Sequence, residues 1–321
     1  MRVTIGLFLL GLATVLAAHS AHLHDSEEML ITREKLEELK MKANFDVMDY
    51  ESHPFKDMTA SEIIYKLGLM RNPNVPKKTI VYGESNADLP ESFNYKEKWP
   101  QCYHNIRDQQ SCGSCWAFAA SEVVSDRFCI ATNGSVKVIM SPQDLVSCDK
   151  NDFGCDGGYV DKSWDYIRDH GIVSDECLPY TAGSGSSGKC PFQKDQGKCK
   201  KGTFRKYKVD SHQQYQTIQD AKETIFTEGP IEAAFDVYSD FMSYKGGVYR
   251  RASDSLLGGH AVKIVGWGKD TDGSEYWIVA NSWNTVWGEQ GFFRIAFGEC
   301  GFEDSLWAGK PHVDLLDKFL N

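Results

Sequence analysis

The pattern of hydrophobic and polar positions divides the chain into three parts. In the first part, apolar side chains recur at helical spacing over Thr32–Phe45. A second short helix is expected over Thr59–Leu69, because Thr59 can cap it and Glu62 follows three residues later. The Pro- and Lys-rich stretch Arg71–Glu84 then predicts extended or linker chain.

The second part, from Leu89 to about Lys200, is dominated by helical and loop patterns. Helices are expected at Trp116–Ile130, behind the cap Ser141, and at Tyr159–His170. The Gly- and Ser-rich stretch Thr181–Gly188 predicts a flexible loop.

The third part, from about Gly202 onward, changes to a strand pattern. Strands are expected at Ile231–Tyr238, Ala261–Trp267 and Tyr276–Ala280, with one helix at Thr217–Phe226. A helical half followed by a β half predicts an α+β fold with two lobes and a cleft between them.

Composition and length add limits on the partners and the compartment. The 321 residues are 41% apolar, enough for two lobes, and the net charge of −10 argues against nucleic acid as the main partner. An apolar N-terminus behind Arg2 predicts a signal peptide over 1–18, cut between Ala17 and Ala21. A membrane anchor is the alternative, but the run is too short and no other stretch approaches about 20 apolar residues.

The cysteines separate two regions of the chain. All ten lie after residue 88, and residues 22–88 contain none. We therefore expect a prosegment over 19–88 and a mature domain over 89–321, with a helical lobe at about 89–200 and a β lobe at about 201–321. The alternative is an N-terminal extension with no inhibitory role. In an oxidising lumen most of these cysteines should form disulfides.

The stretch Asp108–Phe118 contains the strongest chemical signal. Cys115 opens an apolar helix, where the helix dipole favours a thiolate, so we interpret it as a nucleophile. Gln109 is interpreted as a hydrogen-bond donor to the carbonyl that Cys115 attacks. The close pair Cys112 and Cys115 also allows a thiol oxidoreductase, which would join them in a disulfide.

A cysteine nucleophile needs a base and a group that orients the base. His260 follows two glycines at the head of an expected strand, and Asn281 ends the next strand. Trp283 and Trp287 are expected to shield the bond between them from water. We assign structural roles to the other histidines of this region, which are His104, His170, His212 and His312.

Together these residues resemble the papain-like cysteine peptidases, and among them the cathepsin B group. The motif Cys-Gly-Ser-Cys-Trp at 112–116, with His260 and Asn281 downstream, is that family's signature. The similarity extends over essentially all of Leu89–Gly309. It implies a papain-like fold with a helical lobe and a β-barrel-like lobe.

The resemblance implies a role for each site residue. Cys115 attacks the peptide carbonyl, His260 moves the proton, and Asn281 orients His260. The Gln109 side chain and the Cys115 backbone N–H form the oxyanion hole. For substrate binding, the implied residues are Gly157, Gly158, Trp283 and the pocket residue Ser305.

The resemblance also implies the disulfide pairing. The implied pairs are Cys102–Cys129, Cys112–Cys155, Cys148–Cys190 and Cys177–Cys199. Cys115 and Cys300 are then free, and Cys112 is not a rival thiol.

The sequence departs from the cathepsin B pattern at three places. The stretch between Cys177 and Cys190 is short and lacks the paired histidines of the occluding loop. Ser305 replaces a pocket acid, which favours Phe, Leu or Val over Arg, although Glu303 and Asp304 lie close. Gln110 replaces a glycine, at a cost if its φ is positive.

We therefore expect a cysteine-type endopeptidase made as a zymogen, with weak or absent carboxydipeptidase activity. A catalytically inactive papain-like binding protein is the alternative. The expected partners are peptide and protein substrates, the chain's own propeptide as inhibitor, and cystatin-like inhibitors. No cofactor or metal is expected. The expected location is the secretory pathway, ending in a lysosome or endosomal vacuole or outside the cell. Asn133 begins a glycosylation triplet.

Overall fold

The computed structural model describes residues 27–73, 75, 88–192 and 197–313. The signal peptide expected over 1–18 lies outside the described residues, as does most of the expected linker. No helix among the described residues is long and apolar enough to cross a membrane.

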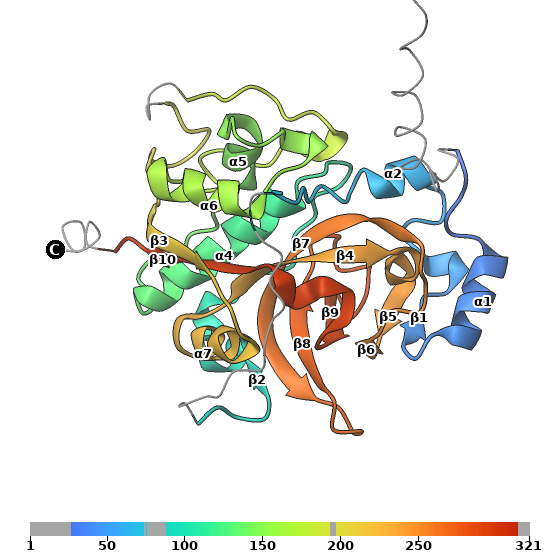
Figure 1. Ribbon diagram of the computed structural model, residues 1–321. Helices are drawn as coiled ribbons and strands as arrows, with labels where there is room; N and C mark the ends of the chain where they lie inside the picture. The colour runs from blue at the N-terminus through green and yellow to red at the C-terminus, as the bar shows by residue number, and fades with distance from the viewer. Residues whose placement is uncertain (1–26, 74, 76–87, 193–196, 314–321) are drawn as a thin grey trace, which may run out of the picture.

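Residues 27–73 form short elements that lie against the β lobe (Figure 1). Their elements are α1 (Arg33–Lys42), β1 (Asp46–Val47) and α2 (Ala60–Ile64). Thr59 and Glu62 form the reciprocal capping box that the sequence indicated for α2. The helix ends at Ile64, however, five residues before the expected end. The chain leaves the helix after Ile64, and Leu69 forms β-bridges with Gly158 and Gly259.

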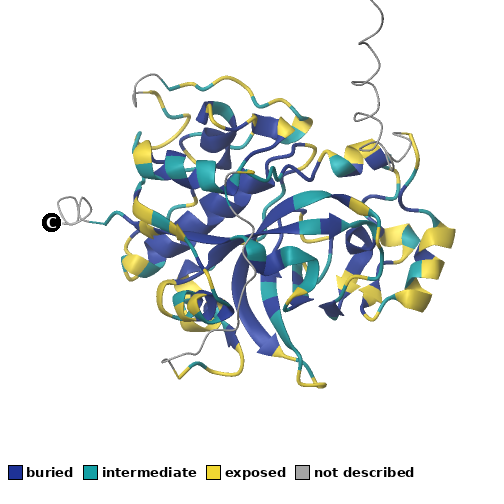
Figure 2. Ribbon diagram, viewed as in Figure 1, coloured by how far each residue is buried: buried dark blue, intermediate teal, exposed yellow. Residues whose placement is uncertain are grey.

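The helical lobe is built around one central helix. The helices between residues 89 and 200 are α3 (Tyr95–Lys98), α4 (Cys115–Ala131), α5 (Pro142–Cys148) and α6 (Val160–Asp169). Ser141 caps α5 through a bond from the Asp144 backbone N–H, and Pro142 occupies its first position. Residues 115–129 of α4 are buried on all sides, because α4 lies between α5, α6 and the sheet (Figures 1 and 2).

The β lobe contains one large, mostly antiparallel sheet. Its strands are β2 (Phe93–Asn94), β3 (Val209–Gln214), β4 (Ile231–Tyr238), β6 (Val248–Tyr249), β7 (Leu256–Lys269), β8 (Glu275–Ala280), β9 (Phe292–Ala296) and β10 (Leu306–Pro311). The order is β3-β10-β4-β7-β8-β9-β6, and β2 pairs with β7. A separate pair joins β1 to β5 (Tyr244–Gly246), and the helix α7 (Ile218–Glu228) packs on β7 and β4.

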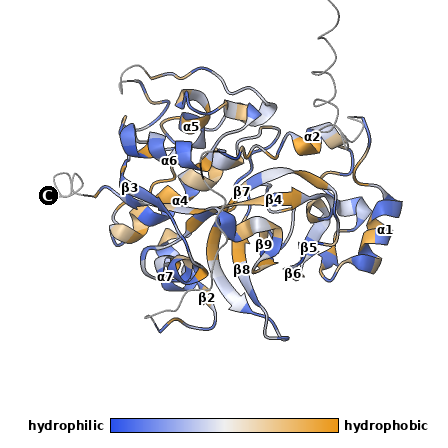
Figure 3. Ribbon diagram, viewed as in Figure 1, coloured by the Kyte–Doolittle hydropathy of each residue, from blue (hydrophilic) through white to orange (hydrophobic). Residues whose placement is uncertain are grey.

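The α+β architecture with two lobes is confirmed, with one correction. The sheet follows an open path and does not close into a barrel within the described residues. Strands β4, β7, β8 and β9 carry the apolar residues of its interior (Figure 3). A buried ion pair joins the lobes, because Lys263 of β7 donates to Asp126 of α4 at 2.8 Å.

Candidate active site

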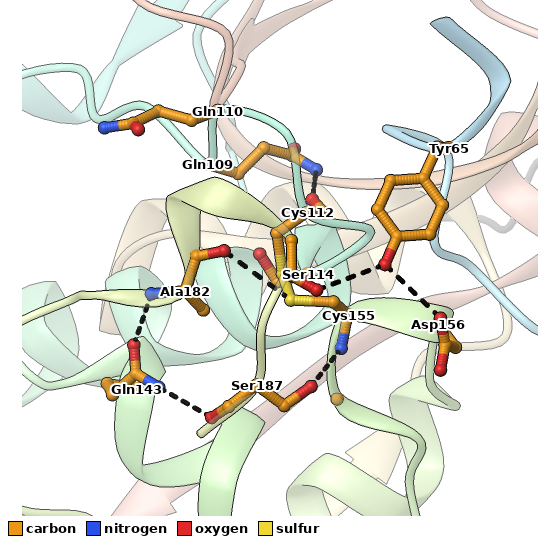
Figure 4. The surroundings of a disulfide bond; sticks show 12 residues. Tyr65, Gln109, Gln110, Cys112, Ser114, Gln143, Cys155, Asp156, Ala182 and Ser187 are labelled. Atoms are coloured by element: carbon orange, nitrogen blue, oxygen red, sulfur yellow. Dashed lines mark hydrogen bonds between the residues drawn. A yellow bond between two sulfur atoms is a disulfide. The ribbon is translucent and has the colours of Figure 1, made fainter. Parts of the chain in front are cut away.

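Cys115 is the first residue of α4 and is fully buried. Its thiol is free, because Cys112 is bonded to Cys155 (Figure 4). This pairing contradicts the oxidoreductase alternative, which requires a bond between Cys112 and Cys115. The disulfide also fixes the turn in front of α4, where the Gly113 N–H donates to the Cys155 carbonyl at 2.9 Å.

The structure holds four disulfides among the described residues. They are Cys102–Cys129, Cys112–Cys155, Cys148–Cys190 and Cys177–Cys199, the pairs that the resemblance implied. Cys300 is free and half-buried, in the short 3-10 helix Glu299–Asp304 between β9 and β10.

His260 lies on β7, and Asn281 directly follows the neighbouring strand β8. The His260 Nε2 atom is 2.7 Å from Asn281 Oδ1, and both side chains are buried. The Trp283 ring lies 4.5 Å from the His260 ring, centroid to centroid, and Trp287 packs edge-on against Trp283. Nδ1 of His260 is buried without a hydrogen-bond partner in the described residues, so the bond to Asn281 leaves this ring nitrogen unoccupied.

Gln109 is fully buried, and three of its hydrogen bonds fix its amide. Its Oε1 accepts from Ser282 Oγ at 2.8 Å, which orients Nε2 away from Ser282. Nε2 donates to the carbonyl oxygens of Cys112 and Lys66, at 2.8 and 2.9 Å. The Lys66 carbonyl belongs to the N-terminal region, so a backbone carbonyl from outside residues 89–321 already occupies this donor.

The same N-terminal segment crosses the cleft between the lobes by backbone pairing. The Leu69 N–H donates to the Gly259 carbonyl at 3.1 Å, and the Met70 N–H donates to the Gly158 carbonyl at 2.8 Å. The Gly158 N–H in turn donates to the Gly68 carbonyl at 2.9 Å. Peptide segments that bind an exposed backbone edge make bonds of this kind.

Gly68 packs tightly against Gly113 in the turn before Cys115. A Cβ atom on Gly68 would lie 1.8 Å from the Gly113 carbonyl oxygen, so only glycine fits. Gly157, beside Gly158, has a φ of 118° and receives the Met70 side chain against it. The segment therefore lies directly against the residues that surround Cys115.

Burial favours the neutral forms of the Cys115 and His260 side chains. Desolvation raises the pKa of Cys115 to about 12, although the backbone N–H groups of Ala261, Gly68 and Trp116 oppose the rise. Desolvation also lowers the pKa of His260 to about 4, and the charge of Lys66 acts in the same direction, while the bond to Asn281 opposes it. In this structure, burial therefore disfavours both a thiolate on Cys115 and an imidazolium on His260.

Ser305 lines a cavity of about 240 Å³ beside the cleft. Ala234, Val160, Asp304 and Trp307 contribute to its walls, and residues of the N-terminal segment cover it. Glu303 is turned into the core instead, where its Oε1 accepts bonds from Trp277 and the Gly298 backbone.

Gln110 adopts a positive φ of 54°, as the comparison with glycine at this position suggested. Its side chain points away from Gln109 (Figure 4), and its carbonyl accepts from Lys66 Nζ at 2.6 Å. The loop that was expected to be flexible is bonded at several points. Gln143 accepts from the backbone of Ala182, and Ser187 accepts from the backbone of Cys155 (Figure 4).

The remaining histidines of this region lie outside the cleft. His104 pairs with Asp126, His212 with Asp165, and His312 with Asp210, and His170 packs on Tyr166. The described residues contain no group of His, Cys, Asp and Glu that would hold a metal ion.

Comparison with known proteins identifies the family. Residues 89–309 match the family described as papain family cysteine protease. The chain belongs to this family. The protease is 40% identical over 297 residues to cathepsin B-like cysteine proteinase 4 of Caenorhabditis elegans, covering 80% of this chain and 87% of that relative. It is 42% identical over 248 residues to a gut-specific cysteine proteinase of the same organism, covering 71% of this chain and 75% of the relative.

A solved structure extends the similarity to the N-terminal region. Procathepsin B S9 from Trypanosoma congolense matches with a TM-score of 0.78 and 32% identity, covering 88% of this chain and 99% of that chain. The chain is therefore a cysteine protease similar to cathepsin B, and its structural neighbours include zymogens that carry a propeptide.

Sequence reasoning missed the residues through which the N-terminal region contacts the cleft. Lys66, Gly68 and Arg71 bind groups that are distant in sequence, so no local pattern identifies them. The one available signal was Gly68, a residue that is unfavourable inside the helix expected over Thr59–Leu69.

Proposed function

We propose that the protease is a cysteine-type endopeptidase made as a zymogen, with a signal peptide over 1–18, a propeptide over 19–88 and a mature domain over 89–321. The observation that carries this proposal is the crossing of the cleft by residues 66–70. Their backbone bonds to Gln109, Gly158 and Gly259 occupy the groups that a peptide substrate would need. The propeptide thus acts as the chain's own inhibitor.

In the processed enzyme, Cys115 attacks the carbonyl carbon of the scissile peptide bond as a thiolate. His260 accepts the thiol proton and later donates it to the leaving amine, while Asn281 holds the imidazole in position. The tetrahedral oxyanion is stabilised by the Gln109 amide and the Cys115 backbone N–H at the start of α4. Water then hydrolyses the thioester, with His260 as the base.

Gly157 and Gly158 bind the extended substrate backbone, and Trp283 flanks the leaving-group side. The cavity at Ser305 takes an apolar side chain such as Phe, Leu or Val in preference to Arg. The buried position of Glu303 supports this preference, because its carboxylate is directed to Trp277 rather than to the cavity.

We also propose weak or absent carboxydipeptidase activity. The loop between Cys177 and Cys190 contains no histidine to bind a terminal carboxylate. The loop is bonded to the helical lobe through the Ala182 backbone N–H and the Ser187 side chain. A peptide with a free C-terminus should be cleaved no faster than its amidated form. A strong preference for the free acid would contradict the proposal.

The protease is further proposed to enter the secretory pathway and to act in a lysosome or endosomal vacuole or outside the cell, where cystatin-like inhibitors are candidate partners. Asn133, exposed in the turn after α4, is the proposed glycosylation site.

Hydrolysis by the processed protein tests the proposed function. The processed enzyme should cleave a reporter peptide after its Phe-Arg sequence, with Phe as the residue for the Ser305 cavity. The intact zymogen should not cleave it. Cys115→Ser is the matched control, because it changes one atom and should abolish turnover. Equal turnover by Cys115→Ser would contradict the assigned nucleophile, and no turnover by the wild type would favour the inactive binding protein.

A further inference from the structure

A charged pair joins the N-terminal segment to the β lobe beside the cleft. The Arg71 Nε and Nη2 atoms donate to Asp236 Oδ1 at 3.2 and 2.6 Å. The two side chains are 32% and 27% exposed, so the pair is partly shielded from water. Arg71 is the one cation in ion-pair distance of Asp236 within the described residues.

Asp236 occupies a defined place relative to the Ser305 cavity. It lies on β4 two residues after Ala234, which lines that cavity. Side chains alternate between the two faces of a strand, so Ala234 and Asp236 are on the same face. Arg71 itself lines the cavity and extends to Asp236. Asp236 does not itself line the cavity, and its carboxylate is reached by the Arg71 side chain.

Removal of the N-terminal segment takes away the cation but leaves the carboxylate. Leu69 and Met70 bind the cleft through backbone bonds that any extended peptide can make, and Arg71 follows them directly. A bound peptide can thus present a side chain to Asp236 as Arg71 does. A guanidinium or ammonium group would restore the lost ion pair.

We propose that Asp236 of the processed enzyme binds an Arg or Lys side chain of the substrate, at a position other than the one that fills the Ser305 cavity. The inference rests on the proposed endopeptidase function and narrows its substrates to peptides that carry a basic residue near an apolar one. Asp236 acts in substrate selection and takes no part in the bond-breaking steps.

Two other carboxylates near the cavity have different surroundings. Asp161 accepts from the Asn72 amide at 2.9 Å and lies 3.6 Å from Lys162, which belongs to the same domain and stays after processing. Asp304 lies in the cavity wall next to Ser305. Asp236 is the carboxylate that a guanidinium from the segment contacts, and the other two serve as controls.

The test compares matched peptides on the processed enzyme. Phe is fixed at the position that fills the cavity, and Arg, Lys, citrulline and norleucine are placed in turn at each of the other positions among the three on either side of the scissile bond. Citrulline has the shape of Arg without its charge. At one position, kcat/KM for Arg should exceed that for citrulline by about tenfold, the lower range for a charged hydrogen bond at a partly exposed site.

Substitution then assigns the preference to its residue. Asp236→Asn should reduce the Arg-to-citrulline ratio to within about twofold, mainly through KM, and Asp236→Glu should retain part of it. Asp161→Asn and Asp304→Asn should keep the ratio. Because Asp236 also holds the N-terminal segment, each preparation is titrated with the epoxide E-64, so that rates refer to active enzyme only.

Three outcomes would overturn the inference. They are the absence of an Arg preference at every position, a ratio that Asp236→Asn leaves unchanged, and a ratio that Asp304→Asn abolishes. In each case the wild type still cleaves the peptides, so the proposed function stands. A wild type that cleaves none of them would overturn both.

Discussion

Because of His53, the N-terminal segment should bind the cleft less tightly in acid. Its side chain is 2% exposed, with Nε2 3.2 Å from Ser243 Oγ and Nδ1 accepting from the Phe55 N–H at 3.1 Å. Burial lowers the pKa of His53 from 6.5 to about 4. A proton therefore favours the released segment, in which His53 has its ordinary pKa. The stabilisation from His53 is complete above pH 6.5 and is lost as the pH falls toward 4.

The size of the effect follows from these two pKa values. Between pH 7 and pH 4.5, a shift from 6.5 to about 4 should weaken the closed state by roughly 60-fold, or about 2.4 kcal/mol. The lowered pKa of His260 acts in the same direction, so the total weakening of the closed state should exceed the part that His53 contributes.

Hydrogen exchange in the intact Cys115→Ala zymogen measures this opening without self-cleavage. The amides of Leu69 and Met70 are protected by bonds to Gly259 and Gly158, so their protection factors report the closed state. His53→Gln keeps a polar side chain but cannot be protonated in this range. Between pH 7 and pH 4.5, the protection factors of the wild-type His53 zymogen should fall roughly 60-fold more than those of His53→Gln.

Exposed Glu34 provides the control, since Glu34→Gln also replaces a polar side chain of this region by glutamine and should behave as wild type. Equal falls in protection for wild type and His53→Gln would refute the reasoning.

Three further predictions concern the cleft. Gln109→Ala should lower kcat by about 10²–10³, because one oxyanion donor is lost. Gln110→Gly should leave kcat/KM within about twofold, since the Gln110 side chain points away from Gln109. Steady-state kinetics on titrated enzyme checks both, and equal losses would contradict the assignment. Ser305→Glu should raise turnover of Arg-Arg relative to Phe-Arg reporter peptides, because it supplies a carboxylate to the cavity, and an unchanged ratio would remove Ser305 from the pocket. Gly68→Ala should weaken binding of the segment, because its Cβ has no room beside Gly113. The intact Gly68→Ala zymogen should then hydrolyse peptides measurably at pH 7. A Gly68→Ala zymogen without this activity would show that the contact is dispensable.

Local patterns identified most elements because their signals are local. The capping box of α2 and the Ser141 cap of α5 depend on residues three positions apart, and both are present in the structure. The apolar run at Trp116–Ile130 indicated α4 correctly, because a helix buried on all sides needs apolar residues all around.

The end of α2 and the contacts of the N-terminal segment could not be predicted in this way. Helical spacing continues past Ile64, but the chain leaves the helix to form bonds with Gly158 and Gly259, which are distant in sequence. Likewise, Asp236 had no signal of its own in the strand pattern. Its place became evident only when the structure put Arg71 against it.

Active-site labelling tests the central claim most directly. The epoxide E-64, followed by peptide mapping, should modify Cys115 in the processed enzyme and leave the intact zymogen unlabelled at pH 7. Cys300 is the internal control, because it is also a free thiol and burial raises its pKa to about 12. Label on Cys115 that appears only after processing is the predicted result. Label on Cys300 instead, or equal labelling of Cys115 in the intact zymogen, would contradict the account.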